Sequence, residues 1–219
     1  MTPVPRGTIG VFDSGVGGLT VLQALRDQLP GERFLYLGDT ARLPYGSKSA
    51  TTVRRYALNA TAHLLEQRIK LLVVACNTAS SFALPQVAAA SPVPVVGVVE
   101  PGVQAALASD AARIGVIGTE GTVASGSYQD ALRRLAPGVQ VRALPCPLFV
   151  PLAEEGWGDH PVTDQVARIY LQPLLDWGIQ ALILRCTHSP LLVPSLSRVT
   201  GPEVRVVASA ASVAAAVRR

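Results

Sequence analysis

The sequence predicts an α/β protein made of two similar parallel-sheet domains, related by a pseudo-twofold axis, with a candidate active site in the cleft between them. Three observations lead to this prediction. Short apolar runs alternate with helix-like segments along the 219 residues, which is the pattern of parallel βαβ units. The second half of the chain repeats the first at a nearly constant offset. Hydrophobic residues make up 49% of the chain and aromatic residues only 5%, as expected for sheets rich in Val, Leu and Ala.

The individual elements follow from the apolar runs and the turns between them. The first run ends in VFDSGVGGL (11–19), whose glycines allow a tight turn into a helix. KLLVVA (70–75) and ALIL (181–184) are almost purely apolar, which is typical of parallel strands buried on both faces. We expect strands at 7–12, 33–37, 70–75, 94–99, 113–117, 139–144, 180–184 and 203–207. We expect helices at 17–29, 49–68, 79–90, 101–109, 121–136, 161–177, 190–199 and 209–218.

The internal repeat defines the domain organisation. Three pairs of segments match in the same order, at offsets between 105 and 110: IGVFDSGVGGLT with IGVIGTEGTVAS, CNTASSFALP with CTHSPLLVP, and PVPVVGVVEPGV with PEVRVVASAASV. We therefore expect one domain from residues 1–98 plus 209–219 and another from residues 99–208. The carboxyl ends of both sets of strands would face each other, which is where open α/β sheets hold their ligands.

Composition excludes several classes of protein. The net charge of +4 comes from scattered basic residues, so we expect no nucleic-acid surface, which would need a cluster. Prolines and glycines interrupt the most apolar region, 71–107, and this argues against a membrane span. The amino terminus MTPVPRGT carries no signal-peptide pattern, and the three cysteines show no CxxC spacing. We expect a cytoplasmic protein with reduced thiols and without a metal site or disulfide framework.

Cys76 and Cys186 end two matching apolar runs and would approach one ligand from opposite sides. A thiol can act as an acid, and a thiolate as a base, near neutral pH when its surroundings lower its pKa. One group can then remove a proton from one face of a carbon while the other returns a proton to the opposite face, and no cofactor is needed. The structural alternative is that each cysteine is a small buried hydrophobe at a strand end.

Polar residues beside the cysteines suggest anion binding. Asn77, Thr78 and Thr187 lie where helices begin, so their side chains would cap those helices or their backbone N–H groups would bind a carboxylate. Asp13 and Ser14 follow the first strand, and Asp13 has a helix N-cap as its structural alternative. The glycine loop after Ser14 is not GxGxxG, so it does not indicate a dinucleotide site.

The histidines and the third cysteine have different roles. His188 follows Cys186 by two residues, so its imidazole would stabilise the thiolate or relay its proton. A metal site is the alternative, but one Cys-x-His pair gives it little support. We expect His63 and His160 on the surface and Cys146 in the core.

FDSGVGGLTVL, LGDTARLPYGSKS, ACNTAS, IGTEGTVASGSY, CPLFVPLAEEG and CTHSPLL resemble, in order, the motifs of glutamate racemases, of the cofactor-independent aspartate/glutamate racemase superfamily. The resemblance extends from residue 8 to about residue 210 and implies conversion of L-glutamate to D-glutamate for peptidoglycan. It implies that Cys76 takes the proton from D-glutamate, assisted by Asp13. Cys186 would take it from L-glutamate, assisted by His188 and Glu154. It also implies that the substrate-binding residues are Asp13, Ser14, Tyr45, Gly46, Asn77, Thr78, Thr119, Thr122, Thr187 and His188.

The sequence departs from the family pattern at two positions. Arg185 stands where a glycine usually precedes the second cysteine, and Ser189 stands where a tyrosine usually follows the histidine. The carboxyl-terminal helical segment that many members carry on the first half has no counterpart here, so we expect a homodimer contact to support that half. The amino-terminal extension of members controlled by a peptidoglycan precursor has no counterpart either, so we do not expect that regulation.

Three other functions share features with this sequence. A pyridoxal-phosphate racemase needs a Schiff-base lysine, and neither Lys48 nor Lys70 lies in a phosphate-binding context. A racemase of aspartate in the same superfamily differs only in how the site reaches the distal carboxylate. A non-catalytic two-lobed protein that binds an acidic amino acid would need the helix starts but not two cysteines.

Overall fold

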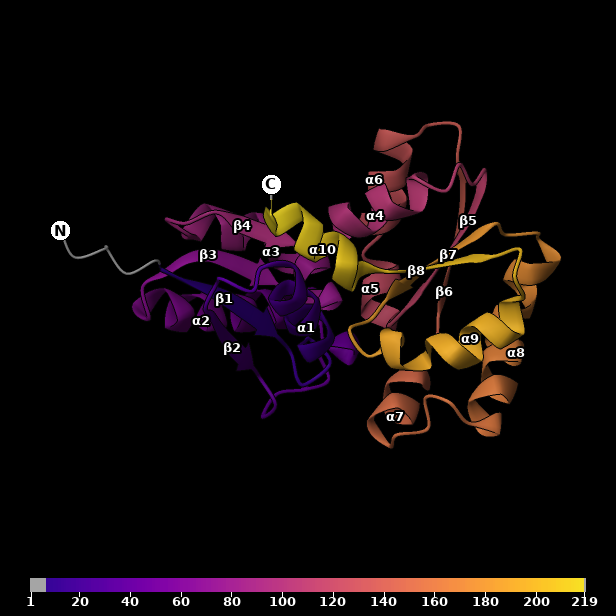
Figure 1. The fold of residues 1–219 in the computed structure, drawn as a ribbon, viewed down its shortest axis with the longest axis horizontal. Coiled ribbons are helices and arrows are strands. Elements are labelled where there is room, and N and C mark those ends of the chain that lie inside the picture. Colours follow the sequence, from indigo (N-terminus) through magenta and orange to yellow (C-terminus); the bar gives the residue numbers. More distant parts are fainter. Residues whose placement is uncertain (1–6, 219) are drawn as a thin grey trace.

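The computed structural model describes residues 7–218, apart from the side chain of Ser189, and contains two four-stranded parallel sheets (Figure 1). The strand order is β2-β1-β3-β4 in the first sheet and β6-β5-β7-β8 in the second. Because the two orders are equivalent, β1 corresponds to β5 and β3 to β7. The prediction of two similar parallel α/β halves is therefore confirmed, and the repeated segments IGVFD and IGVIG lie on the equivalent strands β1 and β5.

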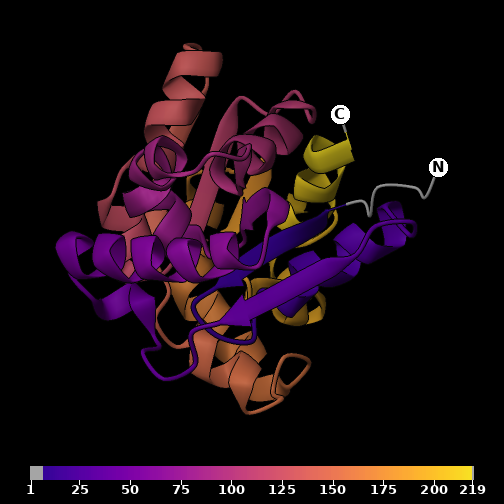
Figure 2. The ribbon, with the colours of Figure 1, turned by 90° about the vertical axis from the view of Figure 1, so that its left-hand side faces the viewer.

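The first lobe contains the elements up to β4 (Figure 2). Its strands are β1 (Thr8–Asp13), β2 (Phe34–Gly38), β3 (Ile69–Val74) and β4 (Val95–Gly97). Its helices are α1 (Leu19–Gln28), α2 (Ala50–Glu66) and α3 (Asn77–Ala90), with a 3-10 turn η1 (Tyr45–Ser47).

The second lobe follows the same plan with more helices. Its strands are β5 (Arg113–Gly118), β6 (Gln140–Pro145), β7 (Ala181–Arg185) and β8 (Arg205–Ala208). Its helical elements are α4 (Val99–Leu107), α5 (Glu120–Ala124), α6 (Ser127–Leu135), α7 (Phe149–Glu154), α8 (Pro161–Asp176), η2 (Ser189–Leu192) and α9 (Val193–Thr200). The last helix, α10 (Ser209–Arg218), returns to the first lobe and packs beside α1 (Figure 1).

Each sheet is buried on both faces, which explains the almost uninterrupted apolar runs of its central strands. Successive residues of β1 alternate between two hydrophobic clusters. Val11 packs with Val21 of α1 and Val213 of α10, whereas Phe12 packs with residues of α2 and α3. None of the described helices is long and apolar enough to cross a membrane.

The expected helix over 121–136 is two helices. Gly126 has φ = 69° and interrupts the chain between α5 and α6, because this left-handed conformation cannot continue a helix. Helices α3 and α4 begin two residues earlier than expected, at Asn77 and Val99, and β4 is correspondingly shorter than the expected strand at 94–99.

The expectation also omitted helix α7 and the short turn η1. Pro147 lies just before α7 and Pro151 lies inside it. Pro151, however, is the third residue of the helix, where the backbone N–H has no intrahelical acceptor and its loss costs little. Helix α7 matters for function because Glu154 is its last residue.

Candidate active site

A cavity lies between the lobes at the carboxyl ends of β1, β3, β5 and β7, where the fold class predicted a ligand site. From the first lobe it is lined by Ser14, Gly15, Leu43, Pro44, Tyr45, Gly46, Cys76, Asn77 and Thr78. From the second it is lined by Thr119, Val150, Glu154, Arg185, Cys186, Thr187 and His188. Its interior volume of about 30 Å³ is small for an amino acid, so we expect the lobes or loops to move apart when a substrate enters.

Cys76 lies between β3 and α3 and is the N-cap of that helix. Its sulfur accepts a hydrogen bond from the backbone N–H of Ala79 (3.4 Å), and its S–H donates to Ser14 Oγ (3.4 Å). Burial, reinforced by the charge of Asp13, raises the pKa of the Cys76 thiol to about 11. Cys76 is therefore a thiol at neutral pH in this structure, and its surroundings do not lower its pKa as a resting thiolate would require.

Asp13 ends β1 and lies behind the cavity wall, not on it. Its Oδ2 accepts hydrogen bonds from the backbone N–H groups of Gly15 and Gly18, both at 3.0 Å. Thr187 Oγ1 of the second lobe donates to Asp13 Oδ1 at 3.4 Å. Burial raises the pKa of the Asp13 carboxyl, and the backbone hydrogen bonds partly oppose this effect. Gly18 is the N-cap residue of α1, so the Asp13 carboxylate, five positions earlier in the chain, accepts a hydrogen bond from a backbone N–H at the start of that helix.

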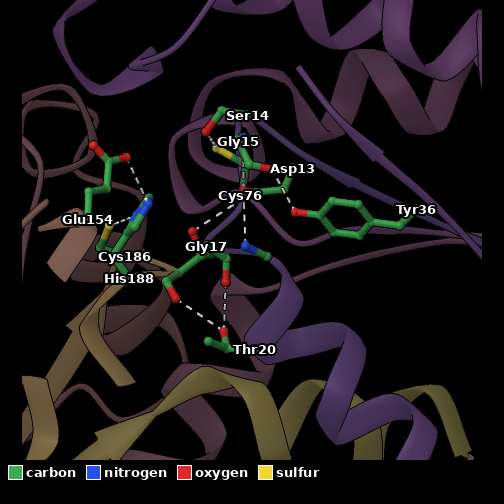
Figure 3. A network of polar contacts seen from close by, with 12 residues as sticks. Asp13, Ser14, Gly15, Gly17, Thr20, Tyr36, Cys76, Glu154, Cys186 and His188 are labelled. Atoms are coloured by element: carbon green, nitrogen blue, oxygen red, sulfur yellow. Dashed lines mark hydrogen bonds and ion pairs between the residues drawn. The ribbon is translucent and has the colours of Figure 1, made fainter. Parts of the chain in front are cut away.

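Cys186, His188 and Glu154 form a line of groups on the second lobe, on the side of the cavity opposite Ser14 and Cys76 (Figure 3). Cys186 Sγ lies 3.4 Å from His188 Nδ1, and His188 Nε2 lies 3.2 Å from Glu154 Oε1. His188 is buried and Glu154 is partly exposed, and Nε2 lies at ion-pair distance from the carboxylate but forms no hydrogen bond. The carboxylate in contact with His188 is that of Glu154 and not that of its neighbour Glu155.

The polar residues after the cysteines do not cap helices, contrary to one of the two expectations. Asn77 Oδ1 accepts a hydrogen bond from Tyr128 Oη (2.6 Å), and Thr78 Oγ1 contacts Thr122 Oγ1 (2.9 Å). Cys76 itself occupies the cap position of α3, and the Thr187 hydroxyl is turned toward Asp13. The sequence predicted that these residues follow the strand ends, but it did not predict their partners, because the partners come from the other lobe.

Two predicted substrate-binding residues have their side-chain polar groups engaged elsewhere. Thr122 is fully buried, lies outside the cavity lining and contacts Thr119 Oγ1 at 2.9 Å. The Tyr45 hydroxyl donates to Asp39 Oδ2 at 2.6 Å, and its ring belongs to the core of the first lobe. Gly46, beside Tyr45, faces Thr119 across the cavity.

The prediction missed five residues that line the cavity: Gly15, Leu43, Pro44, Val150 and Arg185. Leu43 and Pro44 belong to the GDTARLPYG motif, and Arg185 is a charged residue at the end of an apolar strand, so both signals were present in the sequence. His63 and His160 are exposed and Cys146 is buried in the core, as predicted. Within residues 7–218, no group of three His, Cys, Asp or Glu side chains could hold a metal ion.

A sequence model of the Asp/Glu/hydantoin racemase family matches residues 9–217. The chain belongs to this family. It is an amino-acid racemase and therefore an isomerase, as the motifs predicted.

Glutamate racemases from several bacteria are similar to this chain in sequence and in structure. The glutamate racemase of Geobacter metallireducens is 52% identical over 208 residues, which are 94% of this chain and 77% of that protein. The structure of Francisella tularensis glutamate racemase in complex with D-glutamate matches with a TM-score of 0.92 and 36% identity, over 98% of this chain and 81% of that one. The structure of Thermus thermophilus glutamate racemase with β-chloro-D-alanine matches with a TM-score of 0.88 and 50% identity, over 98% and 80% of the two chains.

Proposed function

We propose that this racemase interconverts L- and D-glutamate by a two-base proton transfer between two cysteines, without a cofactor. The observation that carries the proposal is that Cys76 and Cys186 come from different lobes and line one cavity, each with its own polar partners. The named substrate follows the three relatives described above, which are glutamate racemases at 36–52% identity over most of this chain.

In the direction from L- to D-glutamate, Cys186 is the base and Cys76 is the acid. The Cα–H bond breaks, its proton forms an S–H bond on Cys186, and the electron pair stays on Cα. The Cys76 S–H then breaks and its proton bonds to the opposite face of Cα. The reverse reaction exchanges the two roles, so each direction needs one thiol and one thiolate.

The partners of each thiol suit these roles. Burial, together with the charge of Asp13, raises the pKa of the Cys76 thiol, which makes the corresponding thiolate a stronger base toward a weakly acidic Cα–H. On the other side, His188 and Glu154 provide a path by which Cys186 exchanges its proton with solvent. We assign Asp13, His188 and Glu154 as assisting groups on this basis.

Hydrogen-bond donors at the cavity would stabilise the negative charge that develops on the substrate. The first turn of α3 offers the N–H groups of Asn77 and Thr78, which have no intrahelical acceptor. The N–H groups after Ser14 are less available than expected, because those of Gly15 and Gly18 already bind Asp13. We propose Ser14, Gly46, Asn77, Thr78, Thr119, Thr187 and His188 as substrate-binding residues. Tyr45 lines the cavity with its hydroxyl bound to Asp39, and Asp13 and Thr122 support the site from behind the wall.

The test is incubation with L-glutamate in D2O, with D-glutamate followed by chiral chromatography and α-deuterium by mass spectrometry. We expect D-glutamate that carries deuterium at Cα, without added cofactor. Cys76→Ala and Cys186→Ala should each lower the racemisation rate about 10³-fold, because each removes one proton-transfer group.

Other outcomes point to other functions. Faster turnover of L-aspartate than of L-glutamate would identify an aspartate racemase. Binding of glutamate without exchange, and with unchanged affinity in both alanine variants, would identify a binding protein. A Cys76→Ala protein that racemises at the wild-type rate would contradict the two-base assignment.

The product of the reaction indicates the wider role of the enzyme. We propose that it supplies D-glutamate for peptidoglycan in the cytoplasm.

We also propose that the enzyme works as a homodimer. Val16 and Leu19 expose 51% and 46% of their surface on the first lobe, which is the half that a contact between copies is expected to support. Analytical ultracentrifugation at micromolar concentration checks this, and a monomer would contradict the dimer.

A further inference from the structure

Arg185 is a fully buried cation at the end of β7, immediately before Cys186. Its guanidinium lies over the Tyr128 ring, with Cζ 3.9 Å from the ring centroid, and Nη2 donates to the Thr122 carbonyl at 2.7 Å. Nη2 also contacts Ser127 Oγ at 3.4 Å, and Nε has no hydrogen-bond partner. Among the described residues no carboxylate forms an ion pair with it. A buried charge held in this way costs stability and needs a reason.

Arg185 Nη1 donates to Gln129 Oε1 at 3.4 Å. The other three residues that contact the guanidinium also hold the start of helix α3, and they are Thr122, Ser127 and Tyr128 of the α5–α6 corner. Their side chains reach across the lobe boundary in three short contacts: Thr122 Oγ1 with Thr78 Oγ1 at 2.9 Å, Ser127 Oγ to Ser81 Oγ at 2.8 Å, and Tyr128 Oη to Asn77 Oδ1 at 2.6 Å.

These contacts connect the two cysteines through the protein. Arg185 is joined by a peptide bond to Cys186, and Asn77 is joined by a peptide bond to Cys76. Between them lie the guanidinium, the α5–α6 corner and the first turn of α3. Gly126 lies in this corner with φ = 69° and forms the bend between the two helices, and the side-chain contacts above hold the corner against α3.

We propose that Arg185 is a positioning residue that sets the distance between the two cysteines by holding the α5–α6 corner against the start of α3. The inference rests on the proposed two-base reaction. Guanidinium suits this task because its planar fork stacks on an aromatic ring while it donates to carbonyl and hydroxyl groups in fixed directions. A purely structural role is less suitable for a buried cation, since apolar replacement of buried charges is often neutral or stabilising.

The test separates proton removal from inversion. In D2O, the proton that Cys186 removes from L-glutamate is replaced on its sulfur by a solvent deuteron. Cys186 then returns this deuteron to the same face of Cα, which gives labelled L-glutamate, or Cys76 delivers a deuteron to the opposite face, which gives D-glutamate. If Arg185→Met displaces Cys76 relative to Cys186, deuterium should enter unreacted L-glutamate faster relative to D-glutamate formation. We expect this ratio to rise about tenfold or more and kcat to fall up to about 10²-fold, with a small change in KM, because a 1 Å misplacement has an effect of this size.

Two further variants keep the test informative. Tyr128→Phe retains the ring under the guanidinium and removes the hydrogen bond to Asn77, so it should raise the same ratio to a smaller extent. It also serves if Arg185→Met does not fold. Arg185→Lys keeps the charge but not the planar fork, and it should restore less than half of the lost kcat.

The control for ordinary destabilisation is Leu171→Ala, which opens a cavity in the core of the second lobe. It should lower the melting temperature and leave the deuterium ratio unchanged. A wild-type ratio in Arg185→Met and Tyr128→Phe, with wild-type enzyme that racemises glutamate, would overturn the positioning role alone. Absence of racemisation in the wild type would instead overturn the proposed function.

Discussion

Cys76 and Cys186 follow equivalent strands, but their environments differ. Cys76 is buried and contacts a hydroxyl and a backbone N–H, whereas Cys186 is partly exposed and contacts an imidazole. A two-base reaction needs a thiol on one side and a thiolate on the other at any moment. We infer that the difference favours the state in which Cys76 keeps its proton, which is the state that accepts L-glutamate.

The raised pKa of Cys76 predicts a loss of stability at alkaline pH. The folded pKa of about 11 exceeds the value of 9.0 for a free thiol, so the unfolded chain releases this proton first as the pH rises. The contribution of Cys76 to the free energy of unfolding should be constant below pH 9 and should fall by about 2–3 kcal/mol toward pH 11.

Urea unfolding of the wild type and Cys76→Ser at pH 8 to 11 measures this contribution. Serine keeps an oxygen that can cap α3 but does not titrate in this range. Other groups contribute equally to both proteins, so the difference between the two curves isolates Cys76. Parallel curves would show that the thiol has an ordinary pKa in the folded protein.

Among the elements, the division of one expected helix into α5 and α6 has the largest consequence. It turns the chain so that Thr122 and Tyr128 both face α3, and this would not occur on a continuous helix. The left-handed conformation of Gly126 is the local cause.

Gly126→Ala should therefore destabilise the protein by about 1–2 kcal/mol, because a Cβ is unfavourable at this positive φ. Gly31→Ala is the matched control: the position has no positive φ and an added Cβ meets nothing within 4 Å. The control should be neutral or slightly stabilising. Equal stabilities of the two variants in urea unfolding would argue against strain at Gly126.

At the scale of the whole molecule, the packing supports a division between residues 98 and 99 and between 208 and 209. Val98 packs in the first lobe and Val99 in the second. Likewise Val207 packs in the second lobe, whereas Val213 packs in the first. We propose that residues 7–98 plus 209–218 and residues 99–208 move as two bodies about these crossings when substrate enters.

The lobes approach each other closely at Gly46 and Thr119, so we expect a substitution there to change the kinetics. A Cβ added at Gly46 would lie 2.5 Å from the Thr119 Cβ across the cavity, which is too near for two carbons. Gly46→Ala should keep the lobes apart and lower kcat/KM for glutamate roughly ten- to hundredfold, with little change in melting temperature.

Gly138→Ala serves as the comparison, since an added Cβ there meets nothing within 4 Å. Steady-state kinetics in both directions and thermal unfolding measure the two effects. Wild-type kinetics in Gly46→Ala would show that the lobes do not need this close contact for catalysis.

The sequence by itself determined the two-lobed parallel fold, the equivalence of the halves and the placement of Cys76 and Cys186 beside one cavity. These properties follow from local patterns: apolar runs that must be buried on both faces, a repeat in constant register, and the rule that ligand sites lie at the carboxyl ends of parallel strands. The motifs around the cysteines also identified the family correctly.

Only the tertiary structure decided which side chains meet across the lobes. It joined Thr187 to Asp13, Tyr128 to Asn77 and Glu154 to His188, pairs separated by 34 to 174 residues in the chain. It also showed that burial raises the pKa of Cys76 and that Arg185 stacks on Tyr128. Such pairings and burial effects depend on the relative placement of distant segments, which periodicity and spacing do not encode.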